Sequence, residues 1–172
     1  MLKNIRIRWD PIEDRLILRL TSHVDGKDVD HWLQVTRRVA AGWRRDLGQL
    51  ADRSAQIPER FDPHVKATLA AGHHHAVAQQ APMRVEPVET TETQGPTELV
   101  RQVRCGQRKS SGDWVQLFDL CNGATLTLNM TDTTLHGFIK ALDNQLAQSQ
   151  WGILPPVLPP PIDPPPLASG LH

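Results

Sequence analysis

The stretch LQVTRRVAAGWRRDL (residues 33–47) recurs in altered form as LNMTDTTLHGFIKAL (residues 128–142). An offset of 95 residues aligns the two without a gap, and 8 of 15 positions agree when Gln/Asn, Val/Met, Trp/Phe and Arg/Lys count as similar. In each copy a short strand-like run ends in a threonine, and apolar residues at helical spacing follow it. Thr36 lies where a helix N-cap is expected, because its hydroxyl can accept a hydrogen bond from a free backbone N–H. The stretch therefore predicts a strand that leads into a helix, present twice in the chain.

Three strands are predicted before the first of these helices. Residues 4–9, 15–20 and 30–35 alternate apolar and polar side chains, and turn sequences separate them at Asp10-Pro11 and Asp25-Gly26. The alternation places eight apolar side chains toward the core: Ile5, Ile7, Trp9, Leu16, Leu18, Leu20, Leu33 and Val35. The helix that follows buries one stripe, made of Val39, Trp43, Leu47 and Leu50.

The same order is predicted for the second half. Residues 98–105 and 113–120 form a hairpin around residues 109–112, and Asn122-Gly123 is a tight-turn signal before a strand at 125–130. In such a hairpin Cys105 faces a residue near Gln116 and not Cys121, so the two cysteines are expected to be small, unpaired thiols. The second helix buries Leu135, Phe138, Ile139, Leu142 and Leu146.

These patterns predict an α+β fold of duplicated β-β-β-α units, which form an antiparallel sheet with two helices on one face. Residues 1–53 are the first unit and residues 97–151 the second, and the two halves are expected to form one domain. Residues 54–96 are rich in Pro, Thr, Glu and Gln, and are predicted to be a mostly disordered linker. Within it, Asp62-Pro63 can cap and start a short helix that runs to Ala78.

Composition narrows the classes of function. The 172 residues contain 19 Lys and Arg, 19 Asp and Glu, and 39% hydrophobic residues, with a mean hydropathy of −0.40. No run approaches the roughly 18 apolar residues of a membrane span, and residues 1–8 lack the features of a signal peptide. We therefore expect a cytoplasmic protein that does not bind membranes. A balanced charge means that any nucleic-acid binding must depend on a local basic patch.

No catalytic or cofactor motif is present. The sequence lacks GxxxxGK[ST], GxSxG, HExxH and GxGxxG, so we expect a non-enzymatic protein without a cofactor. The run His73-His74-His75 is a weak metal signal, because adjacent residues of a helix point about 100° apart and make a poor cage. No metal site is predicted.

The first candidate binding surface is the outer face of the first helix. It carries a basic stripe that the second copy lacks: Arg37, Arg38, Arg44 and Arg45. The corresponding residues of the second copy are Asp132, Thr133, Ile139 and Lys140, so the shared fold does not require the arginines. The stripe can bind an anionic partner, either a nucleic acid or an acidic protein surface. The alternative is an ordinary solvated helix face.

The second candidate is the outward face of the sheet. Its side chains are Arg6, Arg8, Arg19 and Trp32, to which Arg104 and Trp114 can be added. Arginines interleaved with aromatic rings can follow phosphates and stack on bases. The alternative is a polar or dimer-forming face whose tryptophans lie partly in the core.

The third candidate is the proline-rich tail, residues 152–172. Its docking motif is the Pro-x-x-Pro segment Pro156, Val157, Leu158 and Pro159, with Ile162 beyond it. Such segments favour polyproline II and fit aromatic grooves on other proteins. The tail can instead pack along its own domain or remain a disordered end.

Together these features favour a non-enzymatic adaptor or structural subunit. It would self-associate, with a homodimer as one form, or bind a larger assembly, and the tail would act as a tether. The alternative is a nucleic-acid-binding protein that uses the helix arginines or the Arg/Trp-lined sheet face.

Overall fold

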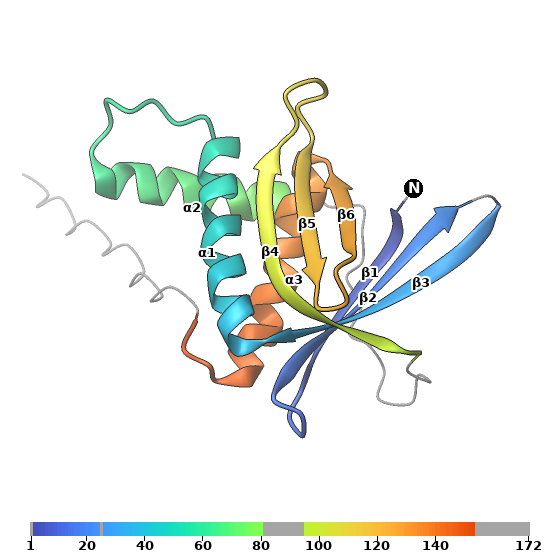
Figure 1. Cartoon of the computed structure of the whole chain (residues 1–172). Helices are drawn as coiled ribbons and strands as arrows, with labels where there is room; N and C mark the ends of the chain where they lie inside the picture. Colours follow the sequence, from blue (N-terminus) through green and yellow to red (C-terminus); the bar gives the residue numbers. More distant parts are fainter. Residues whose placement is uncertain (1, 25, 81–94, 154–172) are drawn as a thin grey trace, which may run out of the picture.

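The computed structural model describes residues 2–24, 26–80 and 95–153. They form a six-stranded sheet and three helices (Figure 1). The elements in chain order are β1 (Leu2–Asp10), β2 (Arg15–Val24), β3 (Lys27–Thr36), α1 (Arg37–Ser54), α2 (Pro63–Gln79), β4 (Thr97–Gln107), β5 (Trp114–Leu120), β6 (Thr125–Met130) and α3 (Asp132–Ser149).

The sheet is mixed, with strand order β1-β2-β3-β4-β5-β6. Each half is an antiparallel three-stranded meander, but β3 and β4 pair in parallel over a short register that begins with Trp32 opposite Thr97. The prediction of a purely antiparallel sheet is therefore wrong. The chain between β3 and β4 is a long crossover that contains two helices, and such a crossover can bring the next strand back in the same direction. The alternation of apolar and polar side chains along a strand does not indicate whether the neighbouring strand runs parallel or antiparallel to it.

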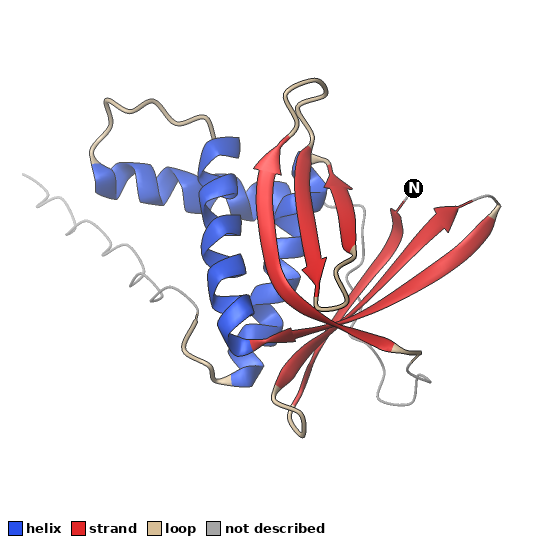
Figure 2. Ribbon diagram, in the orientation of Figure 1, coloured by secondary structure: helices blue, strands red, loops and turns tan. Residues whose placement is uncertain are grey.

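The helices form a second layer on one side of the sheet (Figure 2). α1 and α3 each have 18 residues, and both their starts and their ends are 95 residues apart. The predicted short helix is confirmed as α2, in which Pro63 occupies the first turn and the Asp62 side chain accepts a hydrogen bond from the His64 backbone N–H at 2.8 Å. Of the predicted linker, 17 residues thus form a helix, and residues 81–94 lie outside the described residues.

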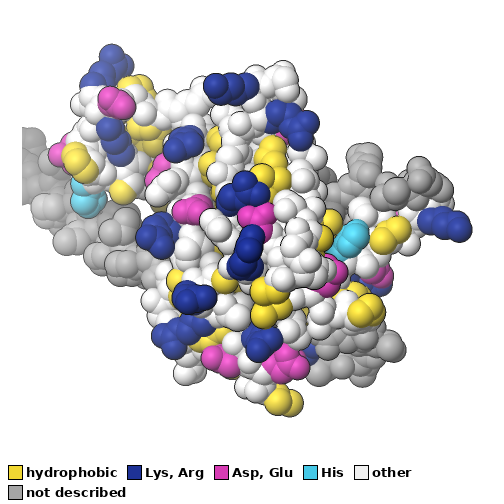
Figure 3. Space-filling view, viewed as in Figure 1, with side chains coloured by type: hydrophobic (Ala, Val, Ile, Leu, Met, Phe, Trp, Pro, Cys, Tyr) yellow, Lys and Arg dark blue, Asp and Glu magenta, His cyan; other side chains and the backbone are white. Residues whose placement is uncertain are grey.

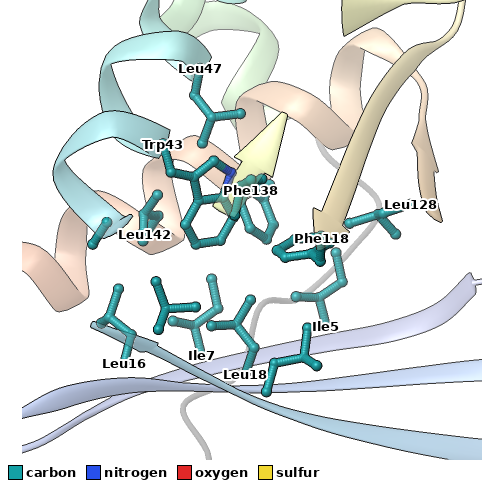
Figure 4. Close-up of a cluster of buried hydrophobic side chains, with 14 of the residues drawn as sticks. Ile5, Ile7, Leu16, Leu18, Trp43, Leu47, Phe118, Leu128, Phe138 and Leu142 are labelled. Atoms are coloured by element: carbon teal, nitrogen blue, oxygen red, sulfur yellow. The ribbon is translucent and has the colours of Figure 1, made fainter. Parts of the chain in front are cut away.

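The core lies between the helices and the inner face of the sheet (Figure 4). Trp43 of α1 contacts Phe118 of β5 edge-on, with ring centroids 5.4 Å apart, and Phe138 of α3 at 5.3 Å. The predicted core stripes are confirmed, because their side chains are buried or packed against the buried cluster. Full burial of each large side chain contributes about 1.5–3 kcal/mol, so this three-element contact holds the two halves together.

One buried hydrogen bond crosses the core. Trp43 Nε1–H donates to Gln116 Oε1 at 2.8 Å, and the Gln116 side chain is fully buried. Buried polar atoms need such partners, because an unpaired donor or acceptor retains its desolvation cost. The pair therefore fixes the orientation of the Trp43 ring.

The second meander follows its predicted turns. Cys105 lies opposite Gln116 in the β4–β5 register, and both cysteines are free thiols. Burial raises the pKa of the Cys105 thiol to about 12, so this thiol is not a nucleophile near neutral pH. Gly123 takes φ +90°, a conformation that favours glycine in the tight turn before β6.

The two helix-capping threonines differ. Thr131 Oγ1 accepts a hydrogen bond from the Thr134 N–H at 3.3 Å, whereas the Thr36 side chain makes no capping hydrogen bond. The prediction of a hydroxyl cap at Thr36 is thus wrong, and the cap is found instead at the equivalent Thr131 of α3. We expect Thr131→Ala to lower the free energy of unfolding by about 1 kcal/mol. Thr36→Ala should cost less than about 0.5 kcal/mol. Chemical denaturation of the two variants measures the difference, and equal losses would contradict it.

Among the described residues, no helix combines the length and the apolarity that crossing a lipid bilayer requires. The tail residues Pro156, Val157, Leu158, Pro159 and Ile162 lie outside the described residues.

Candidate functional site

Two of the four α1 arginines hold the fold together. Arg44 Nε and Nη2 donate to the two carboxylate oxygens of Asp143 on α3, at 2.5 and 2.9 Å. Arg37 Nη2 donates to the backbone carbonyl of Trp151 at 2.9 Å. Both contacts are partly buried. These two side chains therefore bind other parts of the same chain.

The other two arginines face solvent. Within the described part of the chain, neither Arg38 nor Arg45 has an ion-pair partner, and both are exposed. They lie at a hollow of about 740 Å³, which is also lined by Arg37, Ala41, Trp151, Gly152 and Ile153. Of the predicted stripe, this pair remains open to an anionic partner.

A larger groove lies between α1, α2 and α3, with a volume of about 970 Å³. It shares Ala41, Arg45 and Ile153 with the smaller hollow, so the two lie next to each other. Small residues line both walls: Ala41, Gly48 and Ala51 on α1, and Ala67, Ala70 and Ala71 on α2. Three isoleucines add apolar surface: Ile57, Ile139 and Ile153. The lining is mostly apolar, and its charged residues include Arg45, Lys66 and Asp52.

Helix α2 is attached mainly through its C-terminal half. Ala78 is its one buried residue, while Val65 and Leu69 are 42% and 46% exposed. Phe61, just before the helix, is also exposed. Within α2, the spacing of four residues places Val65 and Leu69 on the same face of the helix. In Figure 3 hydrophobic side chains reach the surface at this end of the molecule, with Lys and Arg side chains beside them.

The outward face of β1–β3 is already occupied by internal contacts. Arg19 donates two hydrogen bonds to Asp30 Oδ2, at 3.1 and 2.7 Å, and its guanidinium lies 5.3 Å from the Trp32 ring centroid. The hydrogen bond from Arg19 lowers the pKa of the Asp30 carboxyl. Arg8 forms an ion pair with Asp10 at 3.4 Å. Arg6 lies opposite Arg19 in the register.

Trp32 is not available for stacking on a base. Its side chain is only 6% exposed and packs with Ile17. A Cβ at Gly95 would lie 3.0 Å from Trp32 Cδ1, so the backbone at Gly95 packs closely against the five-membered ring of the indole. Base stacking requires an open aromatic face, and this ring does not offer one.

The placement of Trp114 on the outward face is wrong. Trp114 is buried in the main core, and its Nε1–H donates to Asp132 Oδ1 at 3.0 Å. Arg104, which was predicted on the same face, is half exposed and donates to both carboxylate oxygens of Asp119 at 2.8 Å. Because side chains alternate along β5, Trp114, Gln116 and Phe118 lie on the same face of the sheet, and this is the buried face.

A polar cluster lies where the end of α1, the C-terminal half of α2 and the start of α3 meet. Ser54 Oγ is at its centre, 2.5 Å from Asp132 Oδ1, 3.0 Å from His136 Nε2 and 3.3 Å from His73 Nε2. His74 Nδ1 lies 2.7 Å from His136 Nδ1. His136 is fully buried.

Proton counting assigns the direction of these hydrogen bonds. An ionised carboxylate only accepts, so the single hydroxyl hydrogen of Ser54 goes to Asp132. Both histidines must then donate Nε2–H to Ser54 Oγ, and His136 Nδ1 accepts from His74 Nδ1–H. A nucleophilic serine requires the opposite arrangement, with its hydrogen directed at a histidine. The cluster is therefore not a hydrolytic triad, although it contains Ser, His and Asp.

Burial determines the charge of the two inner histidines. It lowers the pKa of His136 to about 4, helped by the neighbouring His74 and His73 and opposed by Asp132. Burial also lowers the pKa of His74. Both imidazoles are therefore neutral at pH 7, the form in which a ring nitrogen can bind a metal ion.

Sequence reasoning missed this cluster. It weighed His73, His74 and His75 only against one another, but the partner of His73 and His74 is His136, which lies 62 residues beyond His74 on another helix. No local spacing relates the two helices. The available signal was a histidine run on one predicted helix and a single histidine, His136, on another.

Comparisons of the chain with protein-family models, with curated proteins and with solved structures gave no match.

Proposed function

We propose that the chain is a non-enzymatic adaptor or structural subunit that binds a partner protein in the groove between α1, α2 and α3. The observation that carries this proposal is the position of α2. Its C-terminal half packs on the domain, while in its N-terminal half the exposed Ala67, with Lys66 and Ala70, forms one wall of the mostly apolar groove. Helices in water owe most of their stability to packing of an apolar face. A partner would supply the missing packing.

The lining of the groove specifies the kind of partner. Alanine and glycine on both walls let another backbone approach closely, as small residues do between packed helices. The charges of Arg38, Arg45 and Lys66 favour acidic side chains beside the apolar ones. We therefore propose an amphipathic helix of a partner protein, with Asp or Glu residues flanking its apolar stripe.

Site-specific photo-crosslinking in cells tests this proposal. A photoreactive phenylalanine analogue at Ala67, an exposed groove residue, should give a discrete protein adduct. The same analogue at Thr127, an exposed position on β6, should not. Mass spectrometry of the adduct should find the crosslink in an acidic, amphipathic helical segment. A nucleic acid in the adduct, or equal adducts from both positions, would contradict the proposal.

Charge reversal within the groove gives the matching prediction. Arg45→Glu and Lys66→Glu should each reduce the adduct at Ala67 about 3- to 10-fold, because each reversal places like charges opposite the acidic partner. Arg53→Glu is the control, since Arg53 is exposed on the same helix outside the groove lining. Quantitative blotting against unmodified protein measures the yields. A loss with Arg53→Glu as large as with Arg45→Glu would show a general charge effect and no groove.

The tail and self-association belong to the same proposal. Truncation after Ile153 removes the proline-rich segment. It keeps Trp151, whose Nε1–H donates to Asp14, and it keeps Ile153, which packs against the core. If the tail is a tether, this truncation should weaken partner capture and leave the fold intact. Mass measurement in solution separates a homodimer from a complex with another protein. A strict monomer with an unchanged set of partners would contradict both roles.

Nucleic-acid binding is the other outcome to be tested. Phosphate contacts release counterions, so affinity for a single-stranded oligonucleotide would fall steeply with salt. Absence of binding at low salt eliminates it.

We also propose that the two β-β-β-α halves are copies of one ancestral unit. Equal lengths of α1 and α3, with starts and ends 95 residues apart, support this. A related chain whose halves align over the whole unit would test it.

A further inference from the structure

We infer that His73, Asp132 and His136, together with Ser54, form a binding site for a divalent transition-metal ion of the zinc class. The three donor atoms, two imidazole nitrogens and a carboxylate oxygen, all lie within 4.8 Å of one another. They come from two helices, and Ser54 from a third, so the site exists only in the folded chain.

The donor set selects the class of ion. Two imidazole nitrogens with one carboxylate oxygen are typical ligands of zinc and other divalent transition metals, whereas magnesium and calcium prefer oxygen ligands alone. Around a tetrahedral zinc ion, neighbouring donors lie about 3.3 Å apart, given bonds of about 2.0–2.1 Å. Asp132 oxygens lie 3.9 Å from His73 Nε2 and 3.9 Å from His136 Nε2. Small side-chain rotations of the exposed residues bring these distances to the required value.

Ser54 holds the donors together in the metal-free protein. Its hydroxyl makes hydrogen bonds with Asp132, His73 and His136, and so occupies the centre that an ion would take. The ion would replace these three hydrogen bonds with three coordinate bonds. The Ser54 side chain would rotate away from the centre, and its Oγ or a water molecule would complete a four-coordinate shell.

The surroundings support the ligands in the way that metal sites require. A bound ion needs the Nε2 lone pair of His136, so the proton of that ring must move to Nδ1. His74 would then carry its own proton on Nε2, so that its Nδ1, at 2.7 Å, accepts the hydrogen bond from His136 Nδ1–H. Trp114 Nε1–H, at 3.0 Å from Asp132 Oδ1, orients the carboxylate. His73 and Asp132 side chains are 34% and 44% exposed, whereas His136 is fully buried. Ions can therefore enter from the solvent side and bind against a rigid inner ligand.

The test uses the full chain without a histidine tag, stripped of metal with a chelator. Isothermal titration with Zn²⁺ should show one saturable equivalent, and Co²⁺ should give the visible absorption of a tetrahedral N/O site. At about 100-fold excess over the Kd, Zn²⁺ should raise the Tm by about 5–10 °C. Absence of saturable 1:1 binding would overturn the inference.

Variants separate this site from adventitious chelation by the histidine run. His73→Gln and Asp132→Asn should each weaken Zn²⁺ binding at least about 10-fold, and both side chains are exposed enough for the variants to fold. His75→Gln is the matched control, because His75 is exposed and its Nε2 hydrogen-bonds to Gln79 on the same helix, away from the cluster. Equal losses from His73→Gln and His75→Gln would show that the run alone binds the ion, and would refute the site. Circular dichroism of each variant confirms its fold.

Discussion

Replacing Trp43 with alanine should lower the free energy of unfolding by about 3–5 kcal/mol, the largest effect that we expect from a single substitution. The ring is fully buried and contacts Phe118 and Phe138, so its removal leaves a cavity between α1, α3 and β5. It also leaves Gln116 Oε1 without its donor. Denaturant unfolding followed by circular dichroism measures the loss.

A double-mutant cycle separates the cavity from the hydrogen bond. Trp43→Phe leaves Gln116 Oε1 unpaired, at a cost of about 1–3 kcal/mol for that atom alone. Adding Gln116→Leu should recover part of this cost. Ile12→Ala is the control, because Ile12 is 93% exposed and its loss should change stability by less than about 0.5 kcal/mol. A loss of under 1 kcal/mol for Trp43→Ala would contradict the described core.

Lowering the pH from 7.5 to 4.5 in the presence of a chelator should cost about 2–3 kcal/mol of stability through His136. The unfolded chain binds this proton with an ordinary pKa of about 6.5, whereas burial lowers the pKa of His136 in the folded protein to about 4. Below pH 6.5 the unfolded state therefore binds more protons. Stability is fully present above pH 6.5 and falls until the pH reaches about 4.

The groups that face His136 set the size of this effect. His73 and His74 of α2 oppose its protonation, Asp132 of α3 favours it, and Ser54 of α1 is neutral. His136→Gln should reduce the pH dependence between 6.5 and 4.5 and leave the contribution of His74, whose pKa burial also lowers. His64→Gln, at an exposed position of α2, should leave the profile unchanged. Asp30 and Asp119, whose pKa values are lowered by Arg19 and Arg104, act at lower pH and are common to all three proteins. A flat wild-type profile would contradict the assignment.

Local sequence was enough wherever one short pattern decides the structure. The period-2 runs placed Leu16, Leu18 and Leu20 on the inner face, and the helical stripes placed Trp43 and Phe138 in the core. Asp62-Pro63 predicted the start of α2 because capping and the fixed proline φ both act within one turn. These predictions held because their causes lie within a few residues.

Predictions that depended on distant neighbours were less complete. Arg44 was expected to face a partner, but it binds Asp143 across the α1–α3 contact. Trp32 was placed correctly outside the main core, yet the chain at Gly95 covers it. Neither Asp143 nor Gly95 has any sequence relation to the residue that it contacts, so no pattern could have indicated either contact.

The repeated stretch at 33–47 and 128–142 shows the same division. By itself the sequence determined two strand-to-helix units and their buried stripes, since periodicity is a local property of a chain. Tertiary structure alone decided that β3 and β4 pair in parallel and that α2 lines a groove. It also decided that His73 and His136 converge on Ser54. The physical reason is that these features depend on how separate elements pack, and packing is set by surfaces that residues far apart in the chain build together.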